Sequence, residues 1–164
     1  MDLILLSGGH DSSNLIEQSI KRGKKCVALF FDYGQQAFER ELIAAVNVTD
    51  RFGVRMIRRS IPNLQQRGIE WVGRNLAFIS AAVLVAAEQK CDRIVIGCTS
   101  SDHAQFPDCR VEFLSNLNTA VKSAYGVEVV APLRHRPKTK IHGTWSCYEN
   151  GPVQCGKCVS CLQN

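Results

Sequence analysis

The sequence lacks any apolar run that approaches the roughly 20 residues needed to cross a lipid bilayer. Its first residues also lack the basic head and the small-residue cleavage site of a secretory signal peptide. Internal repeats and low-complexity segments are missing as well, which excludes repeat arrays and compositionally biased chains. From these absences we expect a cytoplasmic protein without a membrane partner.

A large excess of charge of one sign is also missing. The formal net charge is +5 over 164 residues, and the basic residues are spread along the chain. A nucleotide or another small anion explains this mild excess as well as nucleic acid does, so we expect no stable nucleic-acid partner. With 45% hydrophobic and 21% charged residues, the chain has the composition of a soluble globular protein, and its length favours a single core.

Strand patterns alternate with helix patterns along the first 131 residues. Strands are expected at 3–6, 26–31, 55–59, 93–96 and 127–131, and helices at 12–20, 38–52, 75–90 and 111–124. This alternation predicts an α/β fold of three layers, with a parallel sheet covered on both faces. The mixed polarity of 55–59 suggests an edge strand, and the Ala-rich segment 75–90 suggests a helix buried on most sides.

The loops that follow the strands are expected at one edge of this sheet, because right-handed crossovers place them there. Ligands bind at that edge in open parallel sheets. The loops concerned begin at Ser7, Asp32, Gly97 and Pro132. We expect segment 101–108 to be loop.

A Gly-Gly turn follows the first expected strand, where Leu6 leads into Ser7, Gly8, Gly9, His10, Asp11, Ser12 and Ser13. Glycines let consecutive N–H groups point at one anion, and the start of the next helix adds unpaired N–H groups. The Asp11 carboxylate could cap that helix or hold a metal ion bound to a phosphate. The alternative is an ordinary strand–turn–helix junction. The sequence therefore favours a phosphate-binding loop, which we call the phosphate loop, at residues 7–13.

Four of the eight cysteines crowd near the end of the chain, at Cys147, Cys155, Cys158 and Cys161. Four thiolates at such spacings can close a tetrahedral zinc site, and Gly156 allows a tight turn between two ligands. An iron–sulfur cluster is the competing use of four cysteines, and redox chemistry at one pair is less favoured. The scattered cysteines, Cys26, Cys91, Cys98 and Cys109, receive no role from the sequence.

Five segments together resemble one family, the 7-cyano-7-deazaguanine synthases of the PP-loop ATP pyrophosphatases. The similar segments are SGGHDS at 7–12, FDYGQ at 31–35, GRNLAF at 73–78, PDCRVEF at 107–113 and WSCY at 145–148. The first segment is common to many PP-loop enzymes, whereas the five in this order are specific. They span nearly the whole chain.

The resemblance implies a PP-loop (adenine nucleotide alpha hydrolase-like) domain at 1–140 and a small zinc-binding tail at 141–164. It also implies a ligase that uses ATP, Mg²⁺ and Zn²⁺ to convert 7-carboxy-7-deazaguanine and ammonia into 7-cyano-7-deazaguanine (preQ0). Two adenylations would give first the amide and then the nitrile, in queuosine biosynthesis. A homodimer is possible. The alternatives are a PP-loop enzyme that adenylates a tRNA base or a protein terminus, and a trimmed binding module without activity.

The resemblance also implies roles for individual residues. Nucleotide contacts fall on Leu6, Ser7, Gly8, Gly9, His10, Asp11, Ser12, Ser13, Tyr33 and Gln35. Substrate contacts fall on Arg74, Asn75, Asp102, Asp108 and Arg110, and the zinc ligands are Cys147, Cys155, Cys158 and Cys161. The catalytic set is Ser7, Asp11, Ser12, Arg74 and Lys138. The competing interpretation of Arg74 is a surface position. For Asp102, Asp108 and Arg110 it is capping of the helix at 111–124. Cys109 is expected to be a packing or substrate contact.

Two segments depart from the family pattern. The loop at 63–68 is shorter than is usual in the family. After Lys138, only residues 139–143 precede the WSCY segment, so one helix of the family is expected to be missing.

Overall fold

The computed structural model describes residues 1–61 and 73–162, and its strands and helices alternate in the expected order. The strands are β1 (Asp2–Leu5), β2 (Cys26–Asp32), β3 (Met56–Ser60), β4 (Arg93–Val95) and β5 (Glu128–Val130). The helices are α1 (His10–Lys21), α2 (Phe38–Phe52), α3 (Arg74–Gln89), α4 (Asp102–Gln105), α5 (Val111–Tyr125) and α6 (Val159–Leu162), with a 3₁₀ turn η1 (Pro107–Cys109). None of these helices in the described chain is both long and apolar enough to cross a membrane.

The five strands form one sheet in the order β3-β2-β1-β4-β5, and every pair is parallel. The α/β prediction is therefore confirmed, and β3 lies at an edge as its mixed polarity suggested. Its Arg58 and Arg59 side chains are exposed, because only one neighbour covers an edge strand. The β1 strand lies in the middle, where its hydrogen bonds are shielded from water on both sides.

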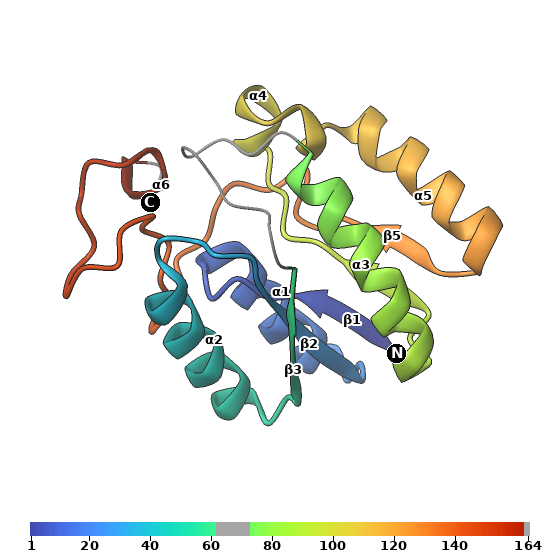
Figure 1. Ribbon diagram of the computed structural model, residues 1–164, viewed down its shortest axis with the longest axis horizontal. Coiled ribbons are helices and arrows are strands. Elements are labelled where there is room, and N and C mark those ends of the chain that lie inside the picture. The colour runs from blue at the N-terminus through green and yellow to red at the C-terminus, as the bar shows by residue number, and fades with distance from the viewer. Residues whose placement is uncertain (62–72, 163–164) are drawn as a thin grey trace.

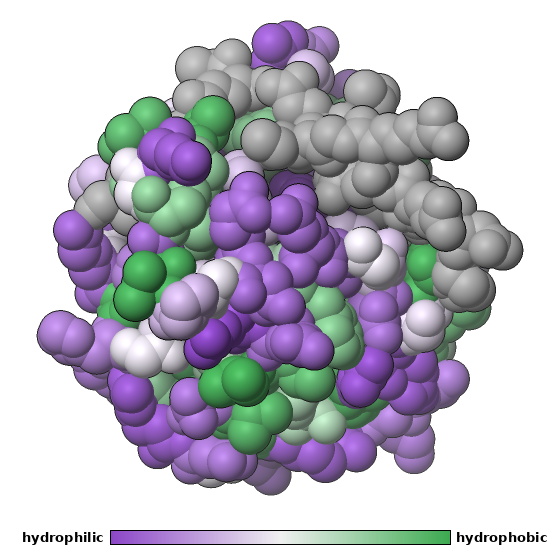
Figure 2. All heavy atoms as spheres, turned by 60° about the vertical axis from the view of Figure 1, so that its left-hand side comes forward, coloured by the Kyte–Doolittle hydropathy of each residue, from purple (hydrophilic) through white to green (hydrophobic). Residues whose placement is uncertain are grey.

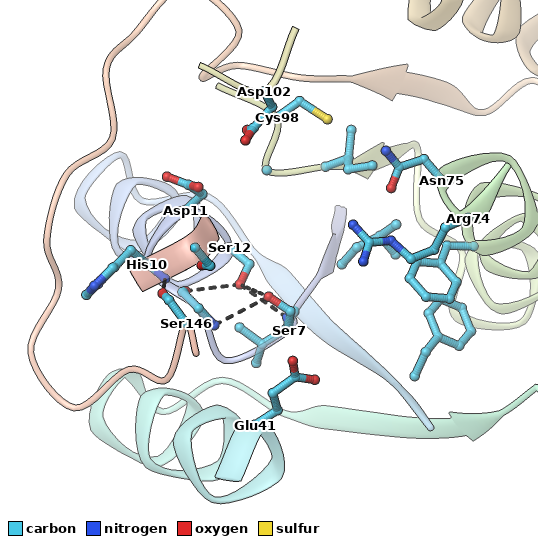
Figure 3. Close-up of a pocket in the computed structure, with 18 of the residues that line it drawn as sticks. Ser7, His10, Asp11, Ser12, Glu41, Arg74, Asn75, Cys98, Asp102 and Ser146 are labelled. Atoms are coloured by element: carbon cyan, nitrogen blue, oxygen red, sulfur yellow. Dashed lines mark hydrogen bonds between the residues drawn. The ribbon is translucent and has the colours of Figure 1, made fainter. Parts of the chain in front are cut away.

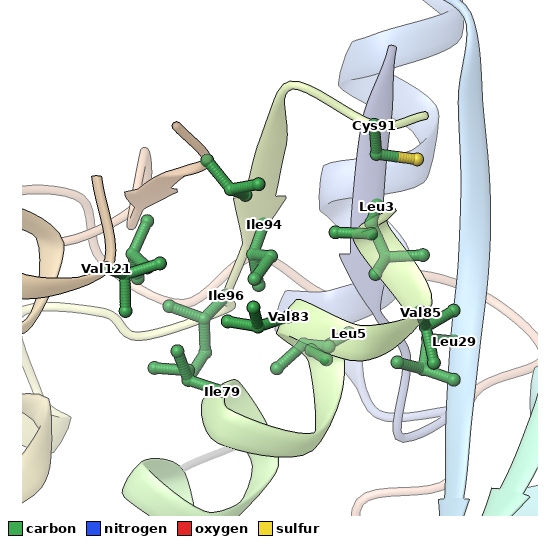
Figure 4. Packing of buried hydrophobic residues seen from close by; sticks show 14 of the residues in the cluster. Leu3, Leu5, Leu29, Ile79, Val83, Val85, Cys91, Ile94, Ile96 and Val121 are labelled. Atoms are coloured by element: carbon green, nitrogen blue, oxygen red, sulfur yellow. The ribbon is translucent and has the colours of Figure 1, made fainter. Parts of the chain in front are cut away.

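Helices cover both faces of the sheet, which gives the predicted three layers (Figure 1). Leu3 and Leu5 of β1 point toward α3 and α5, and this cluster includes Ile79, Val83 and Val121 (Figure 4). Ile4 and Leu6 point the other way, toward α1 and α2. Each such buried aliphatic side chain contributes about 1.5–3 kcal/mol, so the near-continuous apolar strands favour burial on both sides.

Three local expectations differ from the structure. The outer face of α3 is exposed, with Leu76 at 44% and Leu84 at 70%, because the helix covers only one face of the sheet. The segment expected as a loop at 101–108 contains α4 and η1. Helix α1 begins at His10 without a side-chain cap, so Asp11 does not cap it. The loop at 63–68, expected to be shorter than in the family, lies outside the described residues.

The face of the molecule seen in Figure 2 is predominantly polar. In the space-filling view, apolar side chains lie in small separate patches among hydrophilic ones (Figure 2). The strand order reverses between β1 and β4, and the loops after these two strands therefore diverge and leave a crevice between them.

The backbone approaches itself closely at this crevice. Gly97, just after β4, lies so near α1 that a Cβ would come within 3.1 Å of the Ser12 nitrogen. Gly8 has a φ of +79°, and a Cβ there would lie 2.4 Å from the carbonyl oxygen of Glu41 in α2. At Gly8 the left-handed conformation and the lack of space both exclude a side chain, whereas at Gly97 the close approach alone disfavours one.

We expect Gly8→Ala to lower the free energy of unfolding by about 3 kcal/mol, because backbone strain and steric overlap add. Gly126→Ala is the matched control: Gly126 has a φ of +71° and nothing within 4 Å, so only strain of about 1 kcal/mol is expected. Urea denaturation of both variants measures the difference. Equal losses would contradict the close approach between the phosphate loop and α2.

Candidate functional site

A pocket of about 210 Å³ opens at the carboxyl edge of the sheet (Figure 3). The phosphate loop, the end of β2, α2, α3, the segment after β4, the segment after β5 and the tail all contribute to it. Its polar and ionisable lining residues are Ser7, His10, Asp11, Ser12, Tyr33, Gln35, Glu41, Arg74, Asn75, Cys98, Asp102, Cys109, Lys138, Trp145, Ser146, Tyr148 and Ser160. Segments more than 100 residues apart in the chain thus meet in one cavity.

Serine hydroxyls brace the phosphate loop from within. The Ser7 and Ser12 hydroxyls are 3.1 Å apart, the Ser7 N–H donates to Ser12 Oγ at 3.2 Å, and the Gly9 N–H donates to Ser7 Oγ at 3.3 Å. The loop therefore keeps a compact turn at the N-terminus of α1, where helix N–H groups favour an anion. Gly8 and Ser13 are in the loop but do not line the pocket.

Lys138 joins the phosphate loop to the segment after β4. Its Nζ lies 3.5 Å from Asp11 Oδ2 and 3.5 Å from Asp102 Oδ1, and the three side chains are at most 17% exposed. Burial raises the pKa of Asp11, Lys138 opposes this rise, and Asp102 adds to it. The Asp102 carboxylate also accepts hydrogen bonds of 2.8 Å from the N–H and the hydroxyl of Thr99. The buried Asp11 Oδ1 has no hydrogen-bond partner among residues 1–61 and 73–162, so it is suited to a cation.

Both polar atoms of the Gln35 side chain, which follows β2, form hydrogen bonds. Its Oε1 accepts from the Tyr33 N–H at 3.0 Å, and its Nε2 donates to the Phe31 carbonyl at 3.0 Å and to Glu41 Oε2 at 3.1 Å. Gln35 therefore shapes the wall of the pocket through its neighbours. Burial, followed by the charge of Glu41, raises the pKa of Tyr33 to about 12, so Tyr33 is a neutral donor at physiological pH.

The structure places Glu41 in the pocket, although no role was predicted for it. It lies in the first turns of α2 and points toward Ser7, while Arg74 points into the same space from α3 (Figure 3). Burial raises the pKa of Glu41 to about 7, against the opposing effects of the Gln35 hydrogen bond and Arg74. No local pattern distinguishes this glutamate from the solvent-exposed Glu39 two residues earlier. Only the fold could reveal it.

The opposite wall contains a pair of thiols. Cys98 Sγ lies 3.3 Å from Cys109 Sγ, which also accepts from Asn75 Nδ2 at 3.3 Å. Asp108 accepts from the Asn75 N–H at 3.0 Å and so caps α3, not the helix that begins at Val111. Asp108 therefore lies behind the pocket lining.

Two arginines, Arg74 at the start of α3 and Arg110 before α5, differ in their access to the pocket. Arg110 is exposed, lies outside the lining and donates to the His103 carbonyl at 3.5 Å. Arg74, by contrast, lines the pocket and is not a surface residue. The structure thus brings Arg74, Asn75 and Asp102 together and leaves Asp108 and Arg110 outside the cavity.

The four clustered cysteines converge in the tail. The sulfurs of Cys147, Cys155, Cys158 and Cys161 all lie within 4.8 Å of one another. Backbone N–H groups also point at the sulfurs: Cys155 donates to Cys147 and Cys158 donates to Cys155, at 3.3 and 3.4 Å. Gly156, with a φ of +69°, makes the turn between two of them. The group therefore fits one metal ion.

This tail lies directly against the phosphate loop. The Trp145 N–H donates to the Gly8 carbonyl at 2.9 Å, and the His10 N–H donates to Ser146 Oγ at 3.4 Å. His10 Nδ1 accepts from the Ile141 N–H at 3.0 Å, and burial lowers the pKa of this imidazole. His10 therefore anchors the tail as a neutral side chain as well as lining the pocket.

The tail also docks on α2. The Arg40 guanidinium lies 5.4 Å from the centre of the Trp145 ring, and Asn150 Nδ2 donates to Glu39 at 3.1 Å. Arg51 donates to the His142 carbonyl at 2.9 Å. No helix forms between β5 and α6 in the described chain, so the tail reaches the loop in an extended path after Lys138.

We expect Lys138→Met to lower the free energy of unfolding by about 3 kcal/mol at pH 8, because two carboxylates lose their shared cation. The loss should be smaller at pH 5. The pKa of Asp11 is already raised by burial and rises further without Lys138, so this carboxyl takes up a proton as the pH falls. Thermal unfolding at both pH values measures this, with the exposed Lys140→Met as control. Equal losses at pH 5 and pH 8 would contradict the charge interaction.

The sequence is similar to that of one family of known proteins. The family model described as "Queuosine biosynthesis protein QueC" matches residues 1–70 and 60–164 in two overlapping segments. A 7-cyano-7-deazaguanine synthase of Leptospira interrogans is 34% identical over 202 aligned positions, which cover 98% of this chain and 83% of the relative. A 7-cyano-7-deazaguanine synthase of Synechococcus elongatus is 32% identical, with 97% and 86% covered. The alignments are longer than the 164-residue chain, so this chain has gaps opposite segments of its relatives.

A solved structure supports the fold alone. A predicted subunit of a tRNA methyltransferase from Methanocaldococcus jannaschii superposes with a TM-score of 0.50 at 15% identity, over 82% of this chain and 68% of that one. The family model extends over the phosphate loop, the Arg74 and Cys109 segments and the four cysteines. The chain therefore belongs to the QueC family of queuosine biosynthesis proteins, as a short member with the PP-loop fold.

Proposed function

We propose that this protein converts 7-carboxy-7-deazaguanine, ammonia and ATP into 7-cyano-7-deazaguanine for queuosine biosynthesis. One observation carries the proposal: the cavity combines a braced phosphate loop with the Asp11–Lys138–Asp102 cluster and Arg74, in a chain similar throughout to proteins named 7-cyano-7-deazaguanine synthase. No feature of the site favours adenylation of a tRNA base or a protein terminus instead.

The proposed chemistry matches what the loop can stabilise. A carboxylate is a poor electrophile, because its leaving group would be oxide. Attack of this carboxylate on the α-phosphorus of ATP releases pyrophosphate and leaves AMP as the new leaving group. The phosphate loop, together with the preceding Leu6, would bind the pyrophosphate, and Lys138 would offset its charge. The protein then acts mainly by positioning and by electrostatic stabilisation.

Two metal ions fit the residues present. Asp11, whose buried Oδ1 lacks a hydrogen-bond partner in the described part of the chain, would hold Mg²⁺, which neutralises phosphate charge when bound. The four cysteines would hold Zn²⁺, since four thiolates leave no open position and such closed sites are structural. We further propose that Arg74, Asn75 and Asp102 contact the deazaguanine, and that Asp108 acts through Asn75. Free ammonia as the nitrogen donor, a cytoplasmic location and a homodimer stay predictions.

The function is tested by incubating the protein with 7-carboxy-7-deazaguanine, ammonium, ATP, Mg²⁺ and Zn²⁺. Mass spectrometry should detect the nitrile, and AMP and pyrophosphate should appear only when the acid is present. A parallel reaction with unmodified tRNA in place of the acid tests the alternative substrate. Absence of nitrile in the complete mixture would refute the proposal.

The metal site is tested by Cys155→Ser, which should reduce bound zinc from about one ion per chain to nearly none. We also expect a lower Tm and weaker ATP binding, because the tail contacts Gly8 and His10 of the phosphate loop. Cys26→Ala, outside the cluster, is the control and should keep both the zinc and the Tm. An unchanged zinc content in Cys155→Ser would argue against this ligand set.

A further inference from the structure

Glu41 is a pocket residue that the function proposed above does not use. Its carboxyl is oriented by Gln35, whose Nε2 donates to Oε2 at 3.1 Å. The Gln35 amide cannot turn away, because its oxygen accepts from the Tyr33 N–H and its nitrogen also donates to the Phe31 carbonyl. Glu41 Oε1 has no hydrogen bond to residues 1–61 or 73–162, although Glu41 lines the cavity. The Oε2 atom is thus fixed by a hydrogen bond, and the Oε1 atom is available to accept a proton.

The acidic residues of the pocket differ in their partners. Asp11 and Asp102 share the Lys138 ammonium, which keeps them committed to that cluster. Within the described chain, Glu41 has no ion-pair partner, and the ionisable side chains that influence it are Arg74 of α3 and Tyr33 at the end of β2. Because burial raises its pKa to about 7, Glu41 can accept and release a proton near neutral pH.

The proposed reaction has a proton problem that the phosphate loop does not solve. When ammonia attacks the acyl adenylate, the C–N bond forms, the C–O bond to AMP breaks, and the nitrogen must lose one proton. When the amide oxygen attacks the second ATP, pyrophosphate leaves and the nitrogen loses a second proton. Loss of the third proton forms the C≡N bond as AMP departs. Each proton needs an acceptor beside the nitrogen.

We propose that Glu41 is the general base that removes these protons, through the carboxylate oxygen Oε1 that faces the cavity. This inference rests on the proposed function and extends it to the steps after adenylation. Between steps, Glu41 returns the proton to water through the open side of the pocket. Its neighbours support this role: Gln35 orients the carboxyl, and Arg74 favours its charged form.

The test separates the two halves of the reaction. Adenylation is measured without ammonia, as exchange of labelled pyrophosphate into ATP that depends on 7-carboxy-7-deazaguanine. We expect Glu41→Gln to keep this exchange within about threefold, because adenylation moves no proton from nitrogen. Formation of amide and nitrile should fall about 100-fold or more. The exposed Glu112→Gln, the same substitution on α5 and outside the pocket lining, should leave both measurements unchanged.

A pH profile provides a second readout, which a purely structural role would not change. After correction for the fraction of ammonia that is unprotonated, amide formation by the unaltered protein should decline as the pH falls below about 7, where Glu41 becomes protonated. The residual rate of Glu41→Gln should lack this decline. Its Tm at pH 8 should not fall, because the substitution removes a carboxylate that burial destabilises.

Each outcome is decisive. If the unaltered protein shows no pyrophosphate exchange that depends on 7-carboxy-7-deazaguanine, the proposed function fails, and the role of Glu41 fails with it. If the unaltered protein shows this exchange but Glu41→Gln loses pyrophosphate exchange and amide formation to the same extent, Glu41 positions the nucleotide. In that case only the inference about Glu41 is overturned. Retention of amide formation in Glu41→Gln, or a flat profile between pH 6 and pH 8 in the unaltered protein, would also overturn it.

Discussion

Close backbone approach around the phosphate loop is the constraint on which the site depends. Gly8 touches the start of α2, Gly97 touches the start of α1, and a Cβ on Gly9 would lie 3.5 Å from the Ser146 hydroxyl oxygen of the tail. Helix α2, the segment after β4 and the tail therefore each approach the loop closely. Glu41 of α2, Cys98 after β4 and Ser146 of the tail line the same pocket as the loop because the glycines leave them room. Polar groups can then surround a phosphate without long, flexible side chains.

The fold was predictable from the sequence because parallel strands buried on both faces leave a strong pattern. The apolar segments at β1 and β2 and the glycine-rich turn after β1 are local signals, and so is the spacing of the four cysteines. The exposed face of α3 was not predicted, because Leu76 and Leu84 on that face are of a residue type that is usually buried. Short helical turns such as α4 and η1 have too few residues for a periodic pattern.

The candidate site was less predictable, since its contacts join distant segments. Glu41 and Cys98 carry no distinguishing local pattern, and the anchoring of Ile141 by His10 spans 131 residues. Asp108 was expected to contact the substrate, with capping of the helix at 111–124 as the competing interpretation, whereas it accepts from the Asn75 N–H and caps α3. These contacts join groups from segments that are distant in the sequence, so the spacing of residues along the chain could not indicate which groups would meet.

The pocket joins segments that lie far apart in the chain, and this has a consequence for biosynthesis of the protein itself. The phosphate loop is made well before the segment that covers it, around Trp145 and Ser146, which follows it by more than 130 residues. The five strands of the sheet also precede that segment in the chain, so the sheet can form before the cover has been made. A nascent chain that has not yet reached Trp145 therefore presents an open loop without its cover.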